Sequence, residues 1–140
     1  SSRQFNLLLV NAGINDLRRR KNSGLQLDFS EGLRLEYWQK MLLFLKNTGA
    51  AVAVADLLPV IEERYIASAS LIRRNSDVER YNTLIEQVCT EHEIPFLKRY
   101  DIWKQRHLTE LYQDATHPNA TGHQLIADET FSFLQSRELL

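Results

Sequence analysis

This 140-residue sequence lacks features that mark several classes of protein, and each absence excludes a bond, a structure or a kind of partner. Cys89 is the only cysteine, so no internal disulfide can form, and a single thiol is compatible with a reducing cytosol. No apolar run approaches the roughly 18 to 20 residues that a membrane helix needs. The 17 basic and 18 acidic residues nearly cancel, so no overall field favours nucleic acid or an anionic membrane surface. We therefore expect neither a nucleic-acid partner nor a membrane span.

The residues that are present are typical of one folded domain. Hydrophobic residues make up 44% of the chain and charged residues 25%, and the length is sufficient for a single core. No internal repeat, low-complexity tract or linker divides the sequence. We expect one domain over residues 1–140.

Short apolar runs alternate with helical patterns along the chain. In chain order, the pattern predicts strand 5–12, helix 35–45, strand 50–58, helix 76–93, strand 94–97 and helix 119–135. Gly49 is placed to end the first helix, and Ser76 to Glu79 fit a capping box at the start of the second. Strands separated by helices imply right-handed βαβ units. The expected fold class is therefore α/β, a three-layer αβα arrangement with a parallel sheet.

Three stretches show no clean periodicity. Residues 13–32 are polar and punctuated by glycine, which is typical of a long loop. Residues 60–75 have some helical character without an apolar stripe, and residues 100–112 have only partly helical spacing. Loops at the ends of strands often carry function. The loop after the first strand is therefore the first place to look for a site.

Two short motifs lie beside these elements. Gly13-Ile14-Asn15-Asp16 follows the first strand, and Asp114-Ala115-Thr116-His117-Pro118 precedes the last helix. In open α/β sheets, ligands bind beyond the carboxyl ends of the strands. The two motifs could therefore meet at one edge of the sheet.

Their side chains match the needs of ester hydrolysis by an activated hydroxyl. Such a reaction requires a base, a group that orients the base, and donors aimed at the oxygen that becomes negative. A histidine ordinarily titrates near pH 6.5 and can exchange a proton near neutrality, so His117 is the candidate base. Asp114, three residues earlier, can orient the imidazole. Asn15 can donate a neutral hydrogen bond to an oxyanion.

The paired motifs resemble the third and fifth sequence blocks of the SGNH (GDSL-type) hydrolase family. Their order and their separation of 99 residues (114 minus 15) agree with that family, and the resemblance covers nearly the whole chain. It implies a flavodoxin-like parallel sheet and a serine esterase or lipase-like activity on small carboxylic esters, without a metal or organic cofactor. It further implies that Asn15 belongs to the oxyanion hole, that His117 is the general base oriented by Asp114, and that Gly13 lies beside the substrate.

The sequence departs from the family at its beginning. The resemblance leads us to expect a Gly-Asp-Ser-like block carrying the nucleophile, yet none of the nine serines has that context. Asp28-Phe29-Ser30 is only weakly similar to such a block and does not lie where the family has it. The chain thus resembles the family from its third block onward, without the N-terminal strands. Residues Leu7 to Val10 would then leave an uncharged sheet edge uncovered. We expect a companion N-terminal polypeptide that carries the serine, or failing that a homodimer.

Two other functions stay open. The chain could be a noncatalytic binding module that retains the family scaffold. Alternatively, Asp114, His117 and His123 could belong to a metal-dependent hydrolase, since carboxylate and imidazole are common ligands.

Several further residues have a structural and a functional interpretation. We expect Cys89 in the core, Asp16 to shape its turn by bonding to nearby backbone, and Asn119-Ala120-Thr121 to start a helix. The basic run Arg18 to Lys21 is either a solvated loop or an attractor for an anionic substrate group. Trp38 and Trp103 are expected to fill the core, although Trp103 could instead approach the cleft.

Overall fold

The structure is a computed structural model that describes residues 6–65 and 70–140. Phe5, at the start of the predicted first strand, and residues 66–69 of the ambiguous stretch lie outside the described residues. The strands are β1 (Leu7–Val10), β2 (Arg19–Arg20), β3 (Ala51–Ala55), β4 (Leu71–Ile72) and β5 (Phe96–Leu97). The α-helices are α1 (Glu31–Lys46), α2 (Asn75–Glu91), α3 (Tyr100–Lys104), α4 (Leu108–Leu111) and α5 (Ala120–Ser136). Short 3₁₀ helices are η1 (Ile14–Leu17), η2 (Lys21–Ser23) and η3 (Glu62–Arg64).

The main sheet is parallel, as the sequence predicts. Its order is β1-β3-β5, with Leu7 opposite Ala51 and Val54 opposite Phe96. Because all three strands run in one direction, the loops that follow them leave from the same carboxyl-terminal end of the sheet. Among the described residues, β1 and β5 are the edge strands of this sheet.

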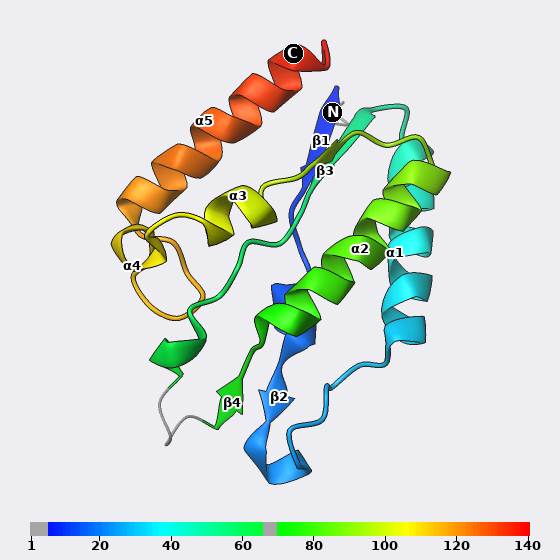
Figure 1. The fold of residues 1–140 in the computed structure, drawn as a ribbon. Coiled ribbons are helices and arrows are strands. Elements are labelled where there is room, and N and C mark those ends of the chain that lie inside the picture. Colours follow the sequence, from blue (N-terminus) through cyan, green and yellow to red (C-terminus); the bar gives the residue numbers. More distant parts are fainter. Residues whose placement is uncertain (1–5, 66–69) are drawn as a thin grey trace, which may run out of the picture.

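Helices lie on both sides of the sheet, which confirms the three-layer α/β class. Figure 1 shows α1 and α2 on one side of the strands and α5 on the other. On the first side, Val52 and Val54 of β3 join Trp38 and Val88 in the main core cluster. On the second side, Trp103 packs with Tyr112 and with partly buried residues of α5. No helix within residues 6–65 and 70–140 is long and apolar enough to cross a bilayer.

The start of α2 corrects the predicted capping box. The helix begins at Asn75, one residue before Ser76, and its N-cap residue Arg74 makes no side-chain capping bond. The carboxylate of Glu62 instead accepts a hydrogen bond from the Asn75 backbone N–H at 2.7 Å. A distant carboxylate therefore satisfies a free N–H of the first turn, a role that local sequence cannot reveal. The end of α1 agrees with expectation, since Gly49 adopts φ 79° just beyond it.

The predicted loop 13–32 contains short elements that the sequence does not indicate. After η1, the two residues of β2 pair antiparallel with β4, with Arg19 opposite Ile72. These two strands lie beyond the end of the main sheet at which β1 stops (Figure 1). Strands of two residues carry no periodic signal, and their pairing partners are about fifty positions apart in sequence.

The segment after β3 is held by two asparagine side chains of α2. The amide of Asn82 accepts from the Leu57 N–H at 2.8 Å and donates to the Leu57 carbonyl at 2.9 Å. Asn75 makes the same pair of contacts with Val60, both at 2.9 Å. Each amide thus satisfies the backbone as a neighbouring strand would. The segment leading from β3 toward the site is fixed without a sheet partner.

Candidate active site

The first motif forms the turn that follows β1. Gly13 has φ 118°, in the left-handed region, and a Cβ there would lie 2.7 Å from Cε1 of Tyr81. Only glycine meets both requirements without strain. The chain then enters η1, where the Asp16 N–H donates to the Gly13 carbonyl at 2.9 Å. This turn carries the exposed side chain of Asn15.

Asp16 holds the turn in a way that corrects the sequence-based expectation. Its carboxylate accepts a hydrogen bond from the Tyr81 hydroxyl at 2.8 Å, not from nearby backbone. That hydroxyl in turn accepts from Nε1 of Trp38 at 2.8 Å. Burial, together with the bond to Asp16, raises the pKa of Tyr81, so its hydroxyl stays protonated and available as a donor. The turn is therefore tied to the core between α1 and α2.

The second motif is a tight loop that brings its carboxylate and imidazole together. Oδ1 of Asp114 accepts from the backbone N–H groups of Thr116 and His117, both at 2.7 Å. Oδ2 of Asp114 lies 2.7 Å from Nδ1 of His117. Because an ionised carboxylate only accepts hydrogen bonds, Nδ1 must carry the hydrogen. In the neutral ring Nε2 is then the free base, on a side chain that is 66% exposed.

The charge of Asp114 is set by these same contacts. Burial by itself raises the pKa of the carboxyl, but hydrogen bonds from the Thr116 and His117 N–H groups and from the His117 imidazole outweigh it. The result is a pKa of about 2. Asp114 is therefore ionised at neutral pH, as a group that orients an imidazole and stabilises its cation must be.

Backbone contacts fix the loop on the body of the protein. Tyr112 and Pro118 form an antiparallel bridge at its base, and Ile61 N–H donates to the Ala115 carbonyl at 2.9 Å. Arg64 donates to the carbonyls of Tyr112 and Asp114, both at 3.1 Å. The position of His117 is therefore set by η3 as well as by α5.

The same loop leads directly into α5. Asn119 caps that helix by accepting from the Gly122 N–H at 3.0 Å, which confirms Asn119 to Thr121 as a helix start. Gly122 itself lies against the carbonyl oxygen of Leu111.

Replacing Gly122 with alanine is expected to destabilise the protein by about 1 to 3 kcal/mol. A Cβ at this position would overlap the Leu111 carbonyl oxygen and lie 2.9 Å from Cβ of Pro118, and neither atom belongs to a flexible side-chain end. Urea denaturation would measure the change in the free energy of unfolding. Gly32→Ala in α1 is the matched control, because no atom lies within 4 Å of the added methyl. It is expected to be neutral or to stabilise by up to about 1 kcal/mol. Equal effects of the two substitutions would contradict the packing argument.

A buried arginine, Arg73, connects the two motifs. Its Nη2 donates to Oδ1 of Asn15 at 2.8 Å, and its Nη1 lies 3.4 Å from Oγ1 of Thr116. Asn15 and the residue next to His117 therefore contact opposite branches of one guanidinium. The structure thus brings both motifs to one edge of the sheet. The sequence gives no sign of this role, because Arg73 lies in a stretch without periodicity.

A cavity of about 280 Å³ opens beside His117. Its lining is mostly apolar, with Leu57 on the segment that follows β3, Tyr112 just after α4 and Ile126 on α5. The described lining contains no serine. Its members are Asn11, Ala12, Ile14, Leu57, Leu58, Tyr112, Thr116, His117, Pro118, His123 and Ile126. Gly13 and Asn15 flank Ile14 in the chain but do not line this cavity, so a place for Gly13 beside the substrate stays a prediction.

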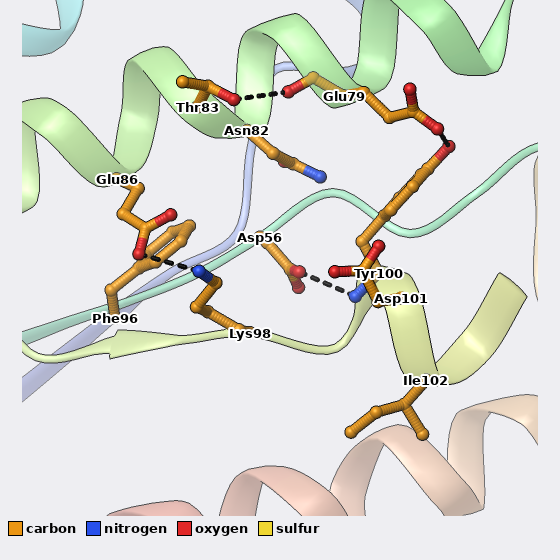
Figure 2. Close-up of a pocket in the computed structure, with 10 residues that line it drawn as sticks. All are labelled: Asp56, Glu79, Asn82, Thr83, Glu86, Phe96, Lys98, Tyr100, Asp101 and Ile102. Atoms are coloured by element: carbon orange, nitrogen blue, oxygen red, sulfur yellow. Dashed lines mark hydrogen bonds and ion pairs between the residues drawn. The ribbon is translucent and has the colours of Figure 1, made fainter.

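A second cavity, of about 350 Å³, is separate from both motifs. Figure 2 shows its lining, with Glu86 bonded to Lys98 and Glu79 to the Tyr100 hydroxyl. Oδ2 of Asp56 accepts from the Tyr100 N–H at 2.7 Å and so caps the start of α3. Asp56, Glu79 and Glu86 are thus engaged in contacts with the start of α3 and with the residue that follows β5.

The remaining candidates have structural surroundings. Cys89 is fully buried, and burial raises its pKa to about 12, so the thiol is neutral. Trp103 is also fully buried and does not line the cavity beside His117; its Nε1 donates to Glu129 at 2.8 Å. Within the described ranges, no group of three or more His, Cys, Asp or Glu side chains is arranged to hold a metal.

The basic run is not a free cluster. Arg19 pairs with the buried carboxylate of Asp77 through bonds of 2.6 and 2.7 Å, and Arg20 pairs with Asp28 at 3.3 Å. Arg18 donates to the Asn15 carbonyl at 2.9 Å. Arg19 therefore anchors β2 on α2, which corrects the expectation of a solvated loop at that residue.

Comparisons with known proteins agree with this fold. Three solved structures share the fold. An acetyl xylan esterase is 17% identical with a TM-score of 0.69, and the match covers 91% of this chain and 66% of the esterase. A GDSL-like lipase from Bacteroides thetaiotaomicron is 19% identical with a TM-score of 0.69, covering 94% of this chain and 63% of the lipase, and an α/β-hydrolase enzyme from the metagenome of Lake Arreo, Spain, is 19% identical with a TM-score of 0.70, covering 91% of this chain and 59% of that enzyme. The chain spans less than two thirds of the length of these structures. No curated protein sequence matches it significantly. The model of the GDSL-like lipase/acylhydrolase family matches residues 2–125, nearly the whole chain. The resemblance inferred from the two motifs is thus confirmed, and the chain belongs to the GDSL-like lipase/acylhydrolase family.

Proposed function

We propose that this chain is the base-bearing and oxyanion-stabilising part of a serine esterase or lipase-like hydrolase that acts on small carboxylic esters. The observation that carries the proposal is the pair formed by Asp114 and His117, 2.7 Å apart, on a loop tied through Arg73 to Asn15. Family membership supports ester hydrolysis, and the mostly apolar cavity beside His117 suits the acyl or alkyl part of an ester.

The nucleophile in this proposal is a serine outside residues 1–140. Its hydroxyl attacks the ester carbonyl while Nε2 of His117 takes the proton, and Asp114 stabilises the imidazolium that results. The carbonyl oxygen becomes negative and accepts a hydrogen bond from Nδ2 of Asn15. His117 then protonates the departing alcohol, and water hydrolyses the acyl-serine with the same base. No metal or organic cofactor takes part in these steps.

Replacing Asn15 with alanine is expected to lower kcat on the order of 100-fold or more, with little change in KM. The lost amide would stabilise the tetrahedral oxyanion more than the neutral carbonyl, so its removal acts on the transition state. Initial rates with p-nitrophenyl acetate would be measured on the chain purified together with any serine-bearing polypeptide that accompanies it. A change confined to KM would place Asn15 in substrate binding instead.

A noncatalytic binding module is the second candidate. It is favoured by one observation, namely that no serine is among the described residues lining the cavity beside His117. Denaturing electrophoresis after treatment with a fluorophosphonate separates the two functions, because the probe labels activated serines. Labelling of a second polypeptide supports the hydrolase. A preparation that contains only the 16.3 kDa chain, unlabelled and inactive, supports the binding module.

A further inference from the structure

Arg73 has an unusual set of partners for a buried guanidinium. It directly follows β4 and is only 8% exposed. Its Nε donates to the Ile14 carbonyl at 2.9 Å, and its Nη2 donates to Oδ1 of Asn15 at 2.8 Å. Its Nη1 lies 3.4 Å from Oγ1 of Thr116 and 3.5 Å from the Tyr65 hydroxyl. All these partners are neutral, and no carboxylate of the described residues forms an ion pair with Arg73.

We propose that Arg73 is a positioning residue that fixes the Asn15 amide in the one orientation that presents Nδ2 to the reacting oxygen. The proposal rests on the function proposed above, in which Asn15 donates to the oxyanion. It adds a residue that acts through Asn15 and does not itself contact substrate.

The side-chain amide of asparagine has an oxygen that accepts hydrogen bonds and a nitrogen that donates them. Oxygen and nitrogen are similar in size, so an exposed asparagine can turn either end toward a site. A guanidinium has donors and no acceptor, so only Oδ1 of Asn15 can face Arg73. Nδ2 then points away from Arg73, and it makes no hydrogen bond with any residue in the described part of the chain. Both of its N–H groups are thus left for a ligand.

A donor stabilises an oxyanion best when its orientation is fixed before the reaction. A preorganised dipole needs no reorientation when negative charge develops, whereas a freely rotating amide would spend part of its time with Oδ1 facing the oxyanion. Arg73 also carries a positive charge that no neighbouring carboxylate among the described residues neutralises. That charge lies within hydrogen-bond distance of the side chain that is to meet the oxyanion.

The second branch of the guanidinium links the donor to the base. Thr116 is bonded through its N–H to Asp114 and precedes His117 in the loop. By contacting Asn15 and Thr116 together, Arg73 fixes the distance between the oxyanion donor and the imidazole. A lysine could reach one of these acceptors, but its single ammonium lacks the planar fork that spans both.

Nuclear magnetic resonance of the ¹⁵N-labelled 140-residue chain tests the orientation without any need for activity. We expect the two Nδ2–H signals of Asn15 to be dispersed in the wild type and to move toward the positions of a free asparagine in Arg73→Met. Arg73→Lys, which keeps one donor, should give an intermediate shift. Arg106→Met is the control, because it removes a partly exposed arginine that pairs with Glu129, and it should leave the Asn15 signals unchanged. Thermal unfolding of each variant shows that the spectra come from folded protein.

Kinetics on a preparation that hydrolyses p-nitrophenyl acetate provide the second readout. Arg73→Met should lower kcat about 10- to 100-fold with KM nearly unchanged, and Arg73→Lys should recover part of the loss. Wild-type Asn15 signals in folded Arg73→Met, or an unchanged kcat, would overturn the proposal. If His117→Ala left hydrolysis intact, the proposed function would fail instead, and the Asn15 signals would still decide whether Arg73 orients the amide.

Discussion

Replacing His117 with alanine is expected to lower kcat/KM for p-nitrophenyl acetate on the order of 1,000-fold or more, in any preparation in which this chain takes part in ester hydrolysis. The imidazole would accept the proton of the attacking hydroxyl and return it to the leaving alcohol, so both halves of the reaction depend on it. Asp114, ionised and bonded to Nδ1, would make that base effective by holding its tautomer. Without the imidazole, the remaining oxyanion donors act on a hydroxyl that is rarely deprotonated.

His92→Ala is the control for this substitution. His92 follows α2 as its C-cap residue and lines none of the cavities described above. The bond that Lys46 donates to it goes to the backbone carbonyl, which alanine retains. Activity should therefore persist in His92→Ala and disappear in His117→Ala, with similar melting temperatures for both. Near-normal turnover in folded His117→Ala would remove this histidine from the mechanism.

The parts of the fold that the sequence predicts are those with local causes. The apolar runs that become β1 and β3 need no partner to be recognised, and the spacing of Trp38 and Leu42 shows which face of α1 is buried. The two motifs are likewise short, so their residues can be recognised in the sequence without knowing where the loops lie. Helical crossovers make the strands parallel, and parallel strands bring the loops that follow them to the same carboxyl-terminal end of the sheet.

The parts that sequence reasoning misses are held by contacts between distant residues. Arg73 is 58 positions from Asn15 in the chain, and Tyr81 is 65 positions from Asp16. No sequence spacing predicts either contact, because the tertiary fold alone brings the two partners together. For the same reason, the first turn of α2 is satisfied at Asn75 by the distant carboxylate of Glu62 and not by a capping box at Ser76. Because Arg73 lies in a stretch without periodicity, no local pattern predicts its burial or the partners that a buried charge needs.

The strand β1 leaves one lateral edge of the main sheet open. Within the described residues, β1 pairs only with β3, and its other edge carries backbone groups without a sheet partner. Leu9, on this strand, is 45% exposed. Residues Leu7 to Val10 include no charged side chain that would discourage pairing with another strand. We expect this edge to be covered by a companion polypeptide or, failing that, by a second copy of the chain.

A companion at this edge would also lie beside the proposed site. The strand β1 runs directly into the turn that carries Asn15, so a segment paired along it would end near the cavity next to His117. Completion of the sheet and delivery of the nucleophilic serine would then be one event. The chain by itself is therefore expected to hydrolyse p-nitrophenyl acetate no faster than a denatured control, and association with a serine-bearing partner is expected to raise the rate by several orders of magnitude.

Light scattering after size-exclusion chromatography, together with denaturing electrophoresis, measures this coupling. The expected species is larger than 16.3 kDa, and the active fractions should contain a second polypeptide that a fluorophosphonate labels. Leu9→Lys should weaken the association and the activity together, because a charge on the edge opposes strand pairing. Leu43→Lys is the matched control, since Leu43 is similarly exposed but lies on α1. A stable monomer that is active and labelled on one of its own serines would refute the proposal, because the nucleophile would then lie within the chain and the edge would need no partner.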